Sequence, residues 1–543
     1  MKSNKKQTYL NMALILMVAN LTVRVIGGIF KIPLMNLLGS EGYANFSDAY
    51  ALYTIFFAIS TAGLPVAISR MISYAGDDEN YLEEKKIFKL ALISFILVGA
   101  VGTGLMICGA KTYAVSAAKN AEAYYSILML APTLFFVCVT SAFRGYFQGR
   151  QNMFPTAISE VIEALGKLCI GIFAAVYAIN KYGVERLDIA AAFAISGLTI
   201  GSAAGVLYLF IKKYLTKRSE EFERTAKSNM PVRKSADILK EIIKISVPIM
   251  LTSSVASLSG AIDTFMMKQR LMDIGWEYKI AKGTYGAYTG MAVPLFSLPN
   301  TLVVALAVSI IPVITSAFKN KNMQAIKSTV ESSFRVASII SMPCAFGLIC
   351  MSKPILNLLY STRKEEVVIA APLLSILGIG IIFVSMMSVT NSMLQAQKQE
   401  NKTFISMLCG IIVKIIVNYI LIGIPAVNKY GTPVGTCLCY LTVMCINFYF
   451  LAKYTKITPP VRKTFIKPFI ASAIMSICTI LSYMLLNNIL HGSKIAVILA
   501  LIIAVAVYMA LVILFKTLTR DDVLLLPKGA NLYEAMKNKK LID

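Results

Sequence analysis

Long apolar runs set the strongest limit on what this chain can fold into. The runs at residues 90–110, 471–486 and 495–515 contain no charged residue. About 20 consecutive apolar residues are enough for a helix to cross the hydrocarbon core of a bilayer. Only 15% of the residues are charged, whereas soluble proteins average about 25%. The chain is therefore predicted to be an all-α membrane protein with many spans.

The apolar runs predict fourteen transmembrane helices joined by short loops. The longest polar stretch, at about 212–244, follows the sixth run. The predicted spans lie near 9–38, 46–74, 87–110, 121–148, 155–179, 188–214, 240–270, 284–318, 327–356, 366–396, 402–426, 432–454, 464–488 and 494–517.

The basic residues predict the orientation of these spans. The formal net charge is +25, and Lys and Arg gather between the apolar runs. They are dense after the sixth span, after the twelfth span and in the C-terminal tail, which all fall on the side of the N-terminus. Cytoplasmic loops carry such an excess, so both termini are predicted to be cytoplasmic. This distribution also favours a membrane interface over nucleic acid as the partner.

An internal repeat divides the chain. Residues 136–168 align with 383–415 without a gap, and eight of 33 positions are identical. The tetrapeptide NKYG recurs at 180–183 and 428–431, where Gly183 and Gly431 are expected to close equivalent helix ends or turns. Two copies of six spans are parallel repeats, and such transporters bind substrate between their halves. The predicted parts are a six-helix lobe at 1–214, a basic linker at 215–239, a second six-helix lobe at 240–456, and two extra helices with a tail at 457–543.

Two segments resemble a known family. They read AGLPVAISRMIS at 62–73 and FRGYFQGRQNMFPTAISEVIE at 143–163. Both are similar to the polysaccharide-biosynthesis and stage V sporulation protein B branch of the superfamily of flippases and multidrug exporters. The resemblance implies a V-shaped bundle with a cationic central cavity, in the bacterial cytoplasmic membrane. It also implies translocation of undecaprenyl-pyrophosphate-linked saccharides, most often the peptidoglycan precursor lipid II. The protein is expected to be a monomer.

One departure from this family concerns the eighth span. Lipid II flippases carry an arginine there, a few residues before a Phe-Pro pair. Residues 290–300 contain no arginine, and Pro294 falls near that place. A cationic role at this position must be absent or met elsewhere, so the identity of the cargo stays open.

The first span contains the first candidate substrate-binding residue, Arg24, about halfway along its apolar run. An arginine at that depth is costly and usually faces a cavity or a partner. Its guanidinium could bind pyrophosphate through two parallel hydrogen bonds, or it could pair with an acidic residue of a neighbouring span. Gly27 and Gly28, one turn later, are expected to permit bending or close helix packing.

Arg70 is the candidate in the second span. It lies near the predicted cytoplasmic end of that span. Binding of the substrate headgroup and snorkelling to lipid headgroups are both open to it. Pro65 is expected to kink the helix.

Further candidate residues lie in the fourth and fifth spans. Arg144 and Gln148 are four residues apart and share a helix face. The repeat retains Gln395 but has Asn391 where the first copy has Arg144, so the cationic character is predicted to be one-sided. Glu160, Glu163 and Lys167 share a face of the fifth span. They either form a Glu163–Lys167 pair or contribute to headgroup or proton coupling.

The seventh span contains an acidic candidate. Asp263 lies centrally in it, where a carboxylate is costly. It is expected either to couple transport to Na⁺ or H⁺, with Asn391 as a conceivable oxygen ligand, or to pair with a basic residue. Lys268 and Arg270, near the outer end, are expected to be interfacial anchors.

These features predict a transporter and no enzyme. No cofactor is expected beyond a coupling Na⁺ or H⁺. The ten cysteines and His491 show no metal-site spacing. A cation-coupled multidrug antiporter on the same fold is the alternative, because acidic groups lie within the spans. A membrane glycosyltransferase or polymerase is more remote, because the loops are short and contain no nucleotide-phosphate motif.

Overall fold

A computed structural model describes residues 2–61, 63–77, 80–225, 231–304, 314, 323–397, 399–455, 462–491, 493–519 and 522. Within these ranges the chain is almost entirely helical and contains no strand, which confirms the all-α prediction. The chain divides into two compact units, Met1–Gln269 and Arg270–Asp543. Each unit has its own packing.

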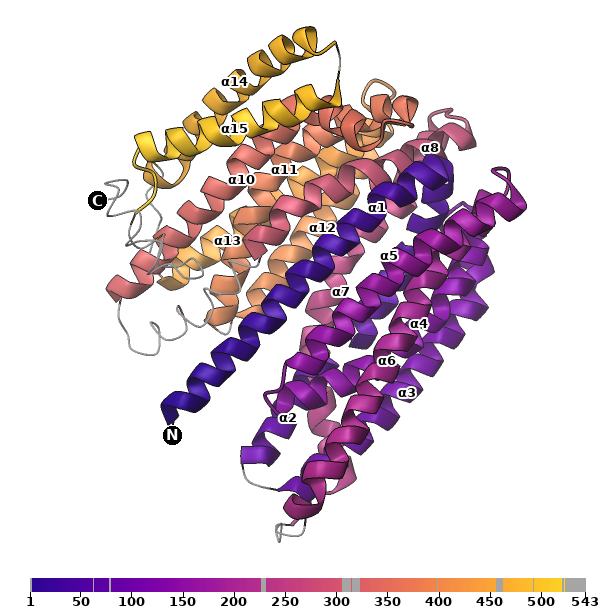
Figure 1. Cartoon of the computed structure of the whole chain (residues 1–543), viewed down its shortest axis with the longest axis vertical. Helices are drawn as coiled ribbons and strands as arrows, with labels where there is room; N and C mark the ends of the chain where they lie inside the picture. Colours follow the sequence, from indigo (N-terminus) through magenta and orange to yellow (C-terminus); the bar gives the residue numbers. More distant parts are fainter. Residues whose placement is uncertain are drawn as a thin grey trace. The chain divides into compact units, whose positions relative to one another are not determined.

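The first unit is a bundle of long helices (Figure 1). α5 packs along α6, and α4 packs against both α3 and α6. The short π-helical turn Tyr113–Ala117 and the 3₁₀ turn Ala121–Ala123 connect α3 to α4. The helices are α1 (Lys2–Thr61), α2 (Leu64–Asp77), α3 (Tyr81–Thr112), α4 (Tyr124–Gly149), α5 (Phe154–Tyr182), α6 (Leu187–Thr225) and α7 (Ser235–Asp273), which reaches into the second unit.

The second unit contains the remaining helices. α10 packs against α11, α12 against α13, and the C-terminal pair α14 and α15 against each other (Figure 1). α14 also contacts α10, so the two helices beyond the predicted repeat are attached to this unit. The helices are α8 (Tyr278–Ala287), continued by the π-helical turn η3 (Tyr288–Ala292), α10 (Met323–Leu359), α11 (Lys364–Ala396), α12 (Glu400–Ile422), α13 (Gly431–Thr455), α14 (Lys467–Ile489) and α15 (Lys494–Leu514).

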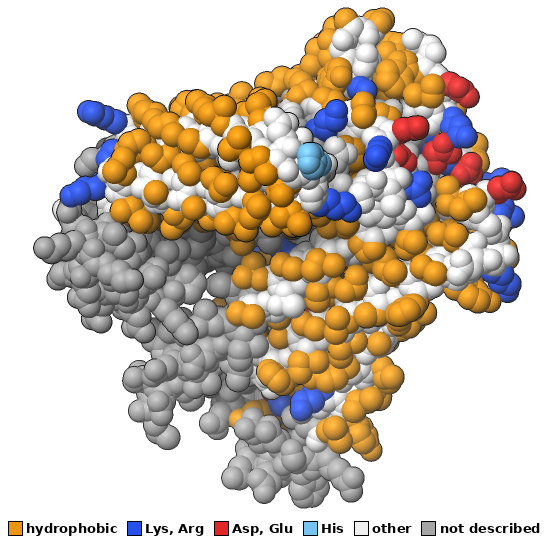
Figure 2. Space-filling view, turned by 45° about the horizontal axis from the view of Figure 1, so that its top comes forward, with side chains coloured by type: hydrophobic (Ala, Val, Ile, Leu, Met, Phe, Trp, Pro, Cys, Tyr) orange, Lys and Arg blue, Asp and Glu red, His pale blue; other side chains and the backbone are white. Residues whose placement is uncertain are grey.

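Twelve helices in the described part of the chain are long and apolar enough to cross a membrane. One of them, Val18–Gly76, covers the first two predicted spans. The seventh predicted span lies in α7, which is not among the twelve. Apolar side chains cover much of the described part of the face drawn in Figure 2. The chain is a multi-pass membrane protein.

The predicted lobe boundaries stay a prediction, and the division at Gln269 assigns most of α7 to the first unit.

The second predicted span is broken at a place that was not predicted. α1 ends at Thr61 and α2 begins at Leu64. Pro65 therefore lies in the first turn of α2, where its missing N–H costs no helical hydrogen bond. The structure thus has a break directly before Pro65, in place of a kink within a continuous helix. Gly63 allows the break, because a Cβ there would collide with the backbone carbonyl oxygen of Ser246 on α7.

The two NKYG glycines have different roles. Gly183 has φ 80° and caps α5, which requires the left-handed region that glycine adopts readily. Gly431 has φ −58°, follows the 3₁₀ turn Asn428–Tyr430 and begins α13. The first glycine closes a helix as predicted, whereas the second ends a short turn and starts a helix. The likeness between the two segments is therefore closer in sequence than in backbone conformation.

Glycines bring α5 and α6 into backbone contact. A Cβ on Gly166 would lie 2.5 Å from the Cα of Gly201, and a Cβ on Gly197 would collide with the backbone nitrogen of Gly171. Small residues at such spacing let membrane helices approach closely. Gly197, Gly201 and Gly205 recur every four residues along α6, so the sequence contained a signal for this contact that was missed.

Gly197→Val is expected to destabilise the first unit by about 1–3 kcal/mol or more, because the added methyl groups must separate two backbones. The measurement is the thermal unfolding of the detergent-solubilised protein. Gly104→Val on α3 is the matched control, because a Cβ there meets no described atom within 4 Å. Equal unfolding temperatures for the two variants would contradict the prediction.

Candidate functional site

A charged cluster joins α4 to α5 within the first unit. The Arg144 guanidinium donates hydrogen bonds to the Ser159 hydroxyl at 3.3 Å and to Glu163 Oε2 at 3.0 Å. Its other terminal nitrogen lies 3.7 Å from Glu160 Oε1. The short connection between the helices places the end of α4 beside the start of α5. The structure thus brings together three of the residues predicted from the sequence.

This cluster differs from the predicted arrangement. Glu163 pairs with Arg144, and the described part of the chain shows no Glu163–Lys167 ion pair. The Lys167 ammonium instead lies over the rings of Phe30 and Tyr50 of α1, at 5.0 and 5.2 Å from their centroids. The guanidinium on α4 thus contacts both Glu160 and Glu163, although Lys167 lies only one turn from Glu163 on α5.

The cluster is partly accessible. The side chains of Arg144, Glu160 and Glu163 are 17%, 16% and 20% exposed. One cation faces two carboxylates, and Glu160 Oε2 has no hydrogen-bond partner among the described residues. Gln148, one turn after Arg144, is half-buried and makes no side-chain hydrogen bond within the described ranges. The group can therefore accept a proton or a cation, or release Arg144 to an anionic ligand.

Arg24 is exposed on α1. Among the described residues it makes no ion pair, so the structure shows no acidic partner of the kind that the sequence left open. A Cβ on Gly27 would meet no described atom within 4 Å, and close helix packing at that glycine is absent there. Gly28 is half-buried in the same helix. A bending role for either glycine stays a prediction.

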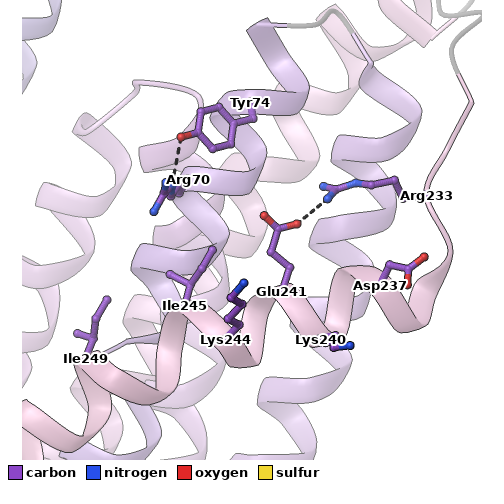
Figure 3. A pocket seen from close by; sticks show the side chains of 9 residues that line it. All are labelled: Arg70, Tyr74, Arg233, Asp237, Lys240, Glu241, Lys244, Ile245 and Ile249. Carbon is purple, nitrogen blue, oxygen red and sulfur yellow. Dashed lines mark hydrogen bonds and ion pairs between the residues drawn. The ribbon is translucent and has the colours of Figure 1, made fainter.

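Arg70 lies in a pocket between α2 and the start of α7, in the first unit. The cavity has a volume of about 660 Å³. Arg70 Nε donates a hydrogen bond of 3.2 Å to the Tyr74 hydroxyl. Figure 3 shows these two residues on α2, facing the turns of α7 that carry Glu241 and Lys244. The pocket is lined by Arg70, Tyr74, Arg233, Asp237, Lys240, Glu241, Lys244, Ile245 and Ile249.

Arg233 closes one side of this pocket and ties the segment before α7 to α3. It forms ion pairs of 2.5 Å with Glu83 and with Glu241. Burial acts to lower the pKa of Arg233, but the hydrogen bonds to the two carboxylates outweigh it and raise that pKa. Lys86 also donates to the Arg233 carbonyl oxygen, at 2.6 Å. Contacts within the protein therefore already fix the position of Arg233.

The ion pair between Asp48 and Lys268 is completely buried. The Lys268 ammonium lies 2.7 and 2.6 Å from the two carboxylate oxygens of Asp48. The side chains are 1% and 0% exposed. Asn120 donates a further hydrogen bond of 2.6 Å to Asp48. The prediction that Lys268 is an interfacial anchor is wrong, because Asp48 on α1 draws it into the core and so ties α7 to the first unit.

The signal for this pair was present in the sequence. Asp48 and Lys268 both fall inside predicted spans and near the same end, and intramembrane charges usually pair. Asp263 is 7% exposed and lies on the same helix as Lys268. Asn391 accepts a hydrogen bond of 2.7 Å from Asn447. Asp263 and Asn391 belong to different units, so a joint ion site stays a prediction.

Comparison with known proteins identifies the family. The profile of the family described as polysaccharide biosynthesis protein matches residues 10–318, and that of the MatE family matches residues 285–420. Stage V sporulation protein B of Bacillus subtilis (strain 168) is 24% identical, over 96% of this chain and 98% of its own. Lipid II flippase MurJ of the same organism is 23% identical, over 79% and 80%.

Two solved structures share the fold. The lipid II flippase MurJ in an inward closed conformation has a TM-score of 0.68 and 17% identity, over 93% of this chain and 99% of its own. An inward-facing multidrug resistance MATE transporter of the MOP superfamily has a TM-score of 0.63 and 14% identity, over 80% and 94%. The family profile covers more than half of the chain. This chain therefore belongs to the polysaccharide biosynthesis protein family.

Proposed function

We propose that the protein is a flippase that translocates an undecaprenyl-pyrophosphate-linked saccharide by alternating access, with lipid II as the leading cargo. The main observation in support of this proposal is the environment of Arg24. This residue is exposed on a long apolar helix and makes no ion pair among the described residues. An intramembrane arginine without an acidic partner suits an anionic ligand, and guanidinium binds phosphate oxygens in a bidentate manner.

The relatives support this cargo class. Stage V sporulation protein B matches almost the whole chain, and the relative named lipid II flippase matches four fifths of it. A lipid-linked saccharide has a headgroup too polar to cross a bilayer unaided. Arg144 and Gln148 are expected to meet that headgroup, with Glu160, Glu163 and Lys167 beside them.

Arg24→Glu is expected to abolish translocation, because a carboxylate would repel the pyrophosphate. The first measurement is lipid II translocation by the purified protein in liposomes. The second is growth of a bacterium depleted of its own flippase. Lys89→Glu, an exposed charge reversal on α3, is expected to retain both activities. Full translocation by Arg24→Glu, at wild-type protein levels in the membrane, would overturn the proposal.

A coupling ion is part of the proposal. Buried Asp263 supports a Na⁺ or H⁺ site in the seventh span. Glu160 Oε2, which has no hydrogen-bond partner in the described part of the chain, supports a proton site in the charged cluster. Translocation is measured in the same liposomes with a Na⁺ gradient, with a H⁺ gradient, or with a membrane potential alone. The condition that accelerates translocation identifies the driving force.

A cation-coupled multidrug antiporter is the second candidate. It is supported by the MatE profile over residues 285–420 and by the excess of carboxylate over guanidinium in the charged cluster, where one arginine faces two glutamates. Efflux of a cationic dye that persists in Arg24→Glu would favour this activity over lipid translocation.

A further inference from the structure

We propose that the pocket between α2 and the start of α7 binds the phosphate group of a membrane lipid. Binding of a lipid phosphate here requires no turnover. Where that lipid is the transported cargo, the inference rests on the proposed function. The pocket volume of about 660 Å³ lies within the range of small-molecule sites, about 300–1,000 Å³. All nine lining residues belong to the first unit.

The charges of the pocket fit a phosphate. Four cations and two carboxylates line it. Glu241 is already bound to Arg233. Arg70, Lys240 and Lys244 make no ion pair within the described ranges, and all three are exposed. The pocket therefore offers cations that an incoming anion could engage without breaking an existing ion pair.

Arg70 is already oriented for a bidentate contact. Its Nε donates to the Tyr74 hydroxyl at 3.2 Å, and its guanidinium carbon lies 5.6 Å from the centroid of the Tyr74 ring. The two terminal nitrogens have no hydrogen-bond partner among the described residues. A guanidinium fork matches two phosphate oxygens, and a side chain that is held in place loses less entropy on binding.

The apolar part of the lining indicates that the anion belongs to a lipid. Asp237, Lys240, Glu241 and Lys244 occupy the first turns of α7, and Ile245 and Ile249 follow along the same helix (Figure 3). On α7 the lining thus passes from charged side chains to isoleucines, and Arg70 of α2 lies across from Ile245 and Lys244 (Figure 3). A lipid headgroup with its attached chain has this same division, whereas a free phosphate would leave the isoleucine wall without a partner.

Two lipid sources share this chemistry. One is the pyrophosphate of a polyprenyl-linked cargo, and the other is the phosphate of an abundant phospholipid. The test uses the detergent-solubilised full chain and counts bound lipid by native mass spectrometry. The probes are undecaprenyl diphosphate, phosphatidylglycerol and the phosphate-free undecaprenol, each added alone.

The variant is Arg70→Gln/Lys244→Gln. The matched control is Lys85→Gln/Lys89→Gln, which removes two exposed charges from α3 in the same unit. Loss of two charge-assisted hydrogen bonds is expected to weaken phosphate-lipid binding by about 10- to 100-fold. The control is expected to bind as wild type. An unchanged unfolding temperature shows that each variant is folded.

The outcomes are distinct. Weakened binding of undecaprenyl diphosphate alone assigns the pocket to the cargo, and weakened binding of both phosphate lipids assigns it to lipid phosphate in general. Undecaprenol binding as tightly as its diphosphate overturns the inference. So does an unchanged affinity of the Arg70/Lys244 variant, or an equal loss in both variants. A protein that binds these lipids but fails to translocate lipid II would contradict only the proposed transport activity.

Discussion

Lys268→Met is expected to cause a large loss of stability. The change leaves the Asp48 carboxylate buried without its cation. Removing one partner of a buried ion pair costs about 3–5 kcal/mol, because the remaining charge keeps its desolvation penalty. The midpoint of thermal unfolding in detergent is expected to fall by at least about 5 °C.

A second change, at the partner residue, provides the test of mechanism. Asp48→Asn/Lys268→Met removes both charges, and the introduced amide oxygen could still accept the hydrogen bond from Asn120. The double variant is expected to regain at least half of the lost unfolding temperature, since burying two neutral side chains is far less costly than burying one charge. Lys89→Met, at an exposed position, is the control. An unfolding temperature of Lys268→Met within about 1 °C of wild type would refute the role of the pair.

Arg144→Gln is expected to lower translocation of lipid II by more than tenfold, which corresponds to about 1.4 kcal/mol. It is also expected to lower stability, because Glu160 and Glu163 would lose the guanidinium that lies between them. Two neighbouring carboxylates in a partly buried site repel each other. Translocation in liposomes and unfolding temperature are measured on the same preparations.

A second variant separates the two roles of Arg144. Arg144→Gln/Glu163→Gln removes one of the two carboxylates left without a cation, and with it their mutual repulsion, so it is expected to restore part of the lost stability. If Arg144 contacts the pyrophosphate, translocation stays low in this double variant. If Arg144 only neutralises Glu163, translocation returns, and the hypothesis that Arg144 binds the substrate is refuted. Arg186→Gln breaks the exposed pair with Asp188 and is expected to change neither measurement, because exposed ion pairs contribute about 0–1 kcal/mol.

The helices were predictable because each apolar run must satisfy its backbone hydrogen bonds internally once it enters a bilayer. Their interruptions were less predictable. Pro65 suggested a kink within a span, but the helix breaks at Gly63, where α7 approaches. The likeness of the two NKYG segments did not extend to the conformation of Gly431. The position of a helix break and the conformation of a glycine both depend on the chain segments that pack beside them.

The candidate site was also predictable only in part, because its side-chain partners lie on different helices. Helical spacing places Arg144 beside Gln148 and groups Glu160, Glu163 and Lys167. The choice of partner required a second helix, since Glu163 pairs with Arg144 of α4 rather than with a residue of its own helix. The pocket at Arg70 depends on residues more than 160 positions later in the chain, which no local pattern could have joined.

The sequence by itself determined that this protein is an all-α membrane protein of a recognisable family, because hydrophobic length and residue spacing act along a single helix. Only the tertiary structure decided which charges meet. Lys268 looked like a surface anchor until Asp48 from another helix placed both side chains out of solvent. Electrostatic pairing depends on distances of a few ångströms between helices, and those distances follow from packing rather than from the order of residues.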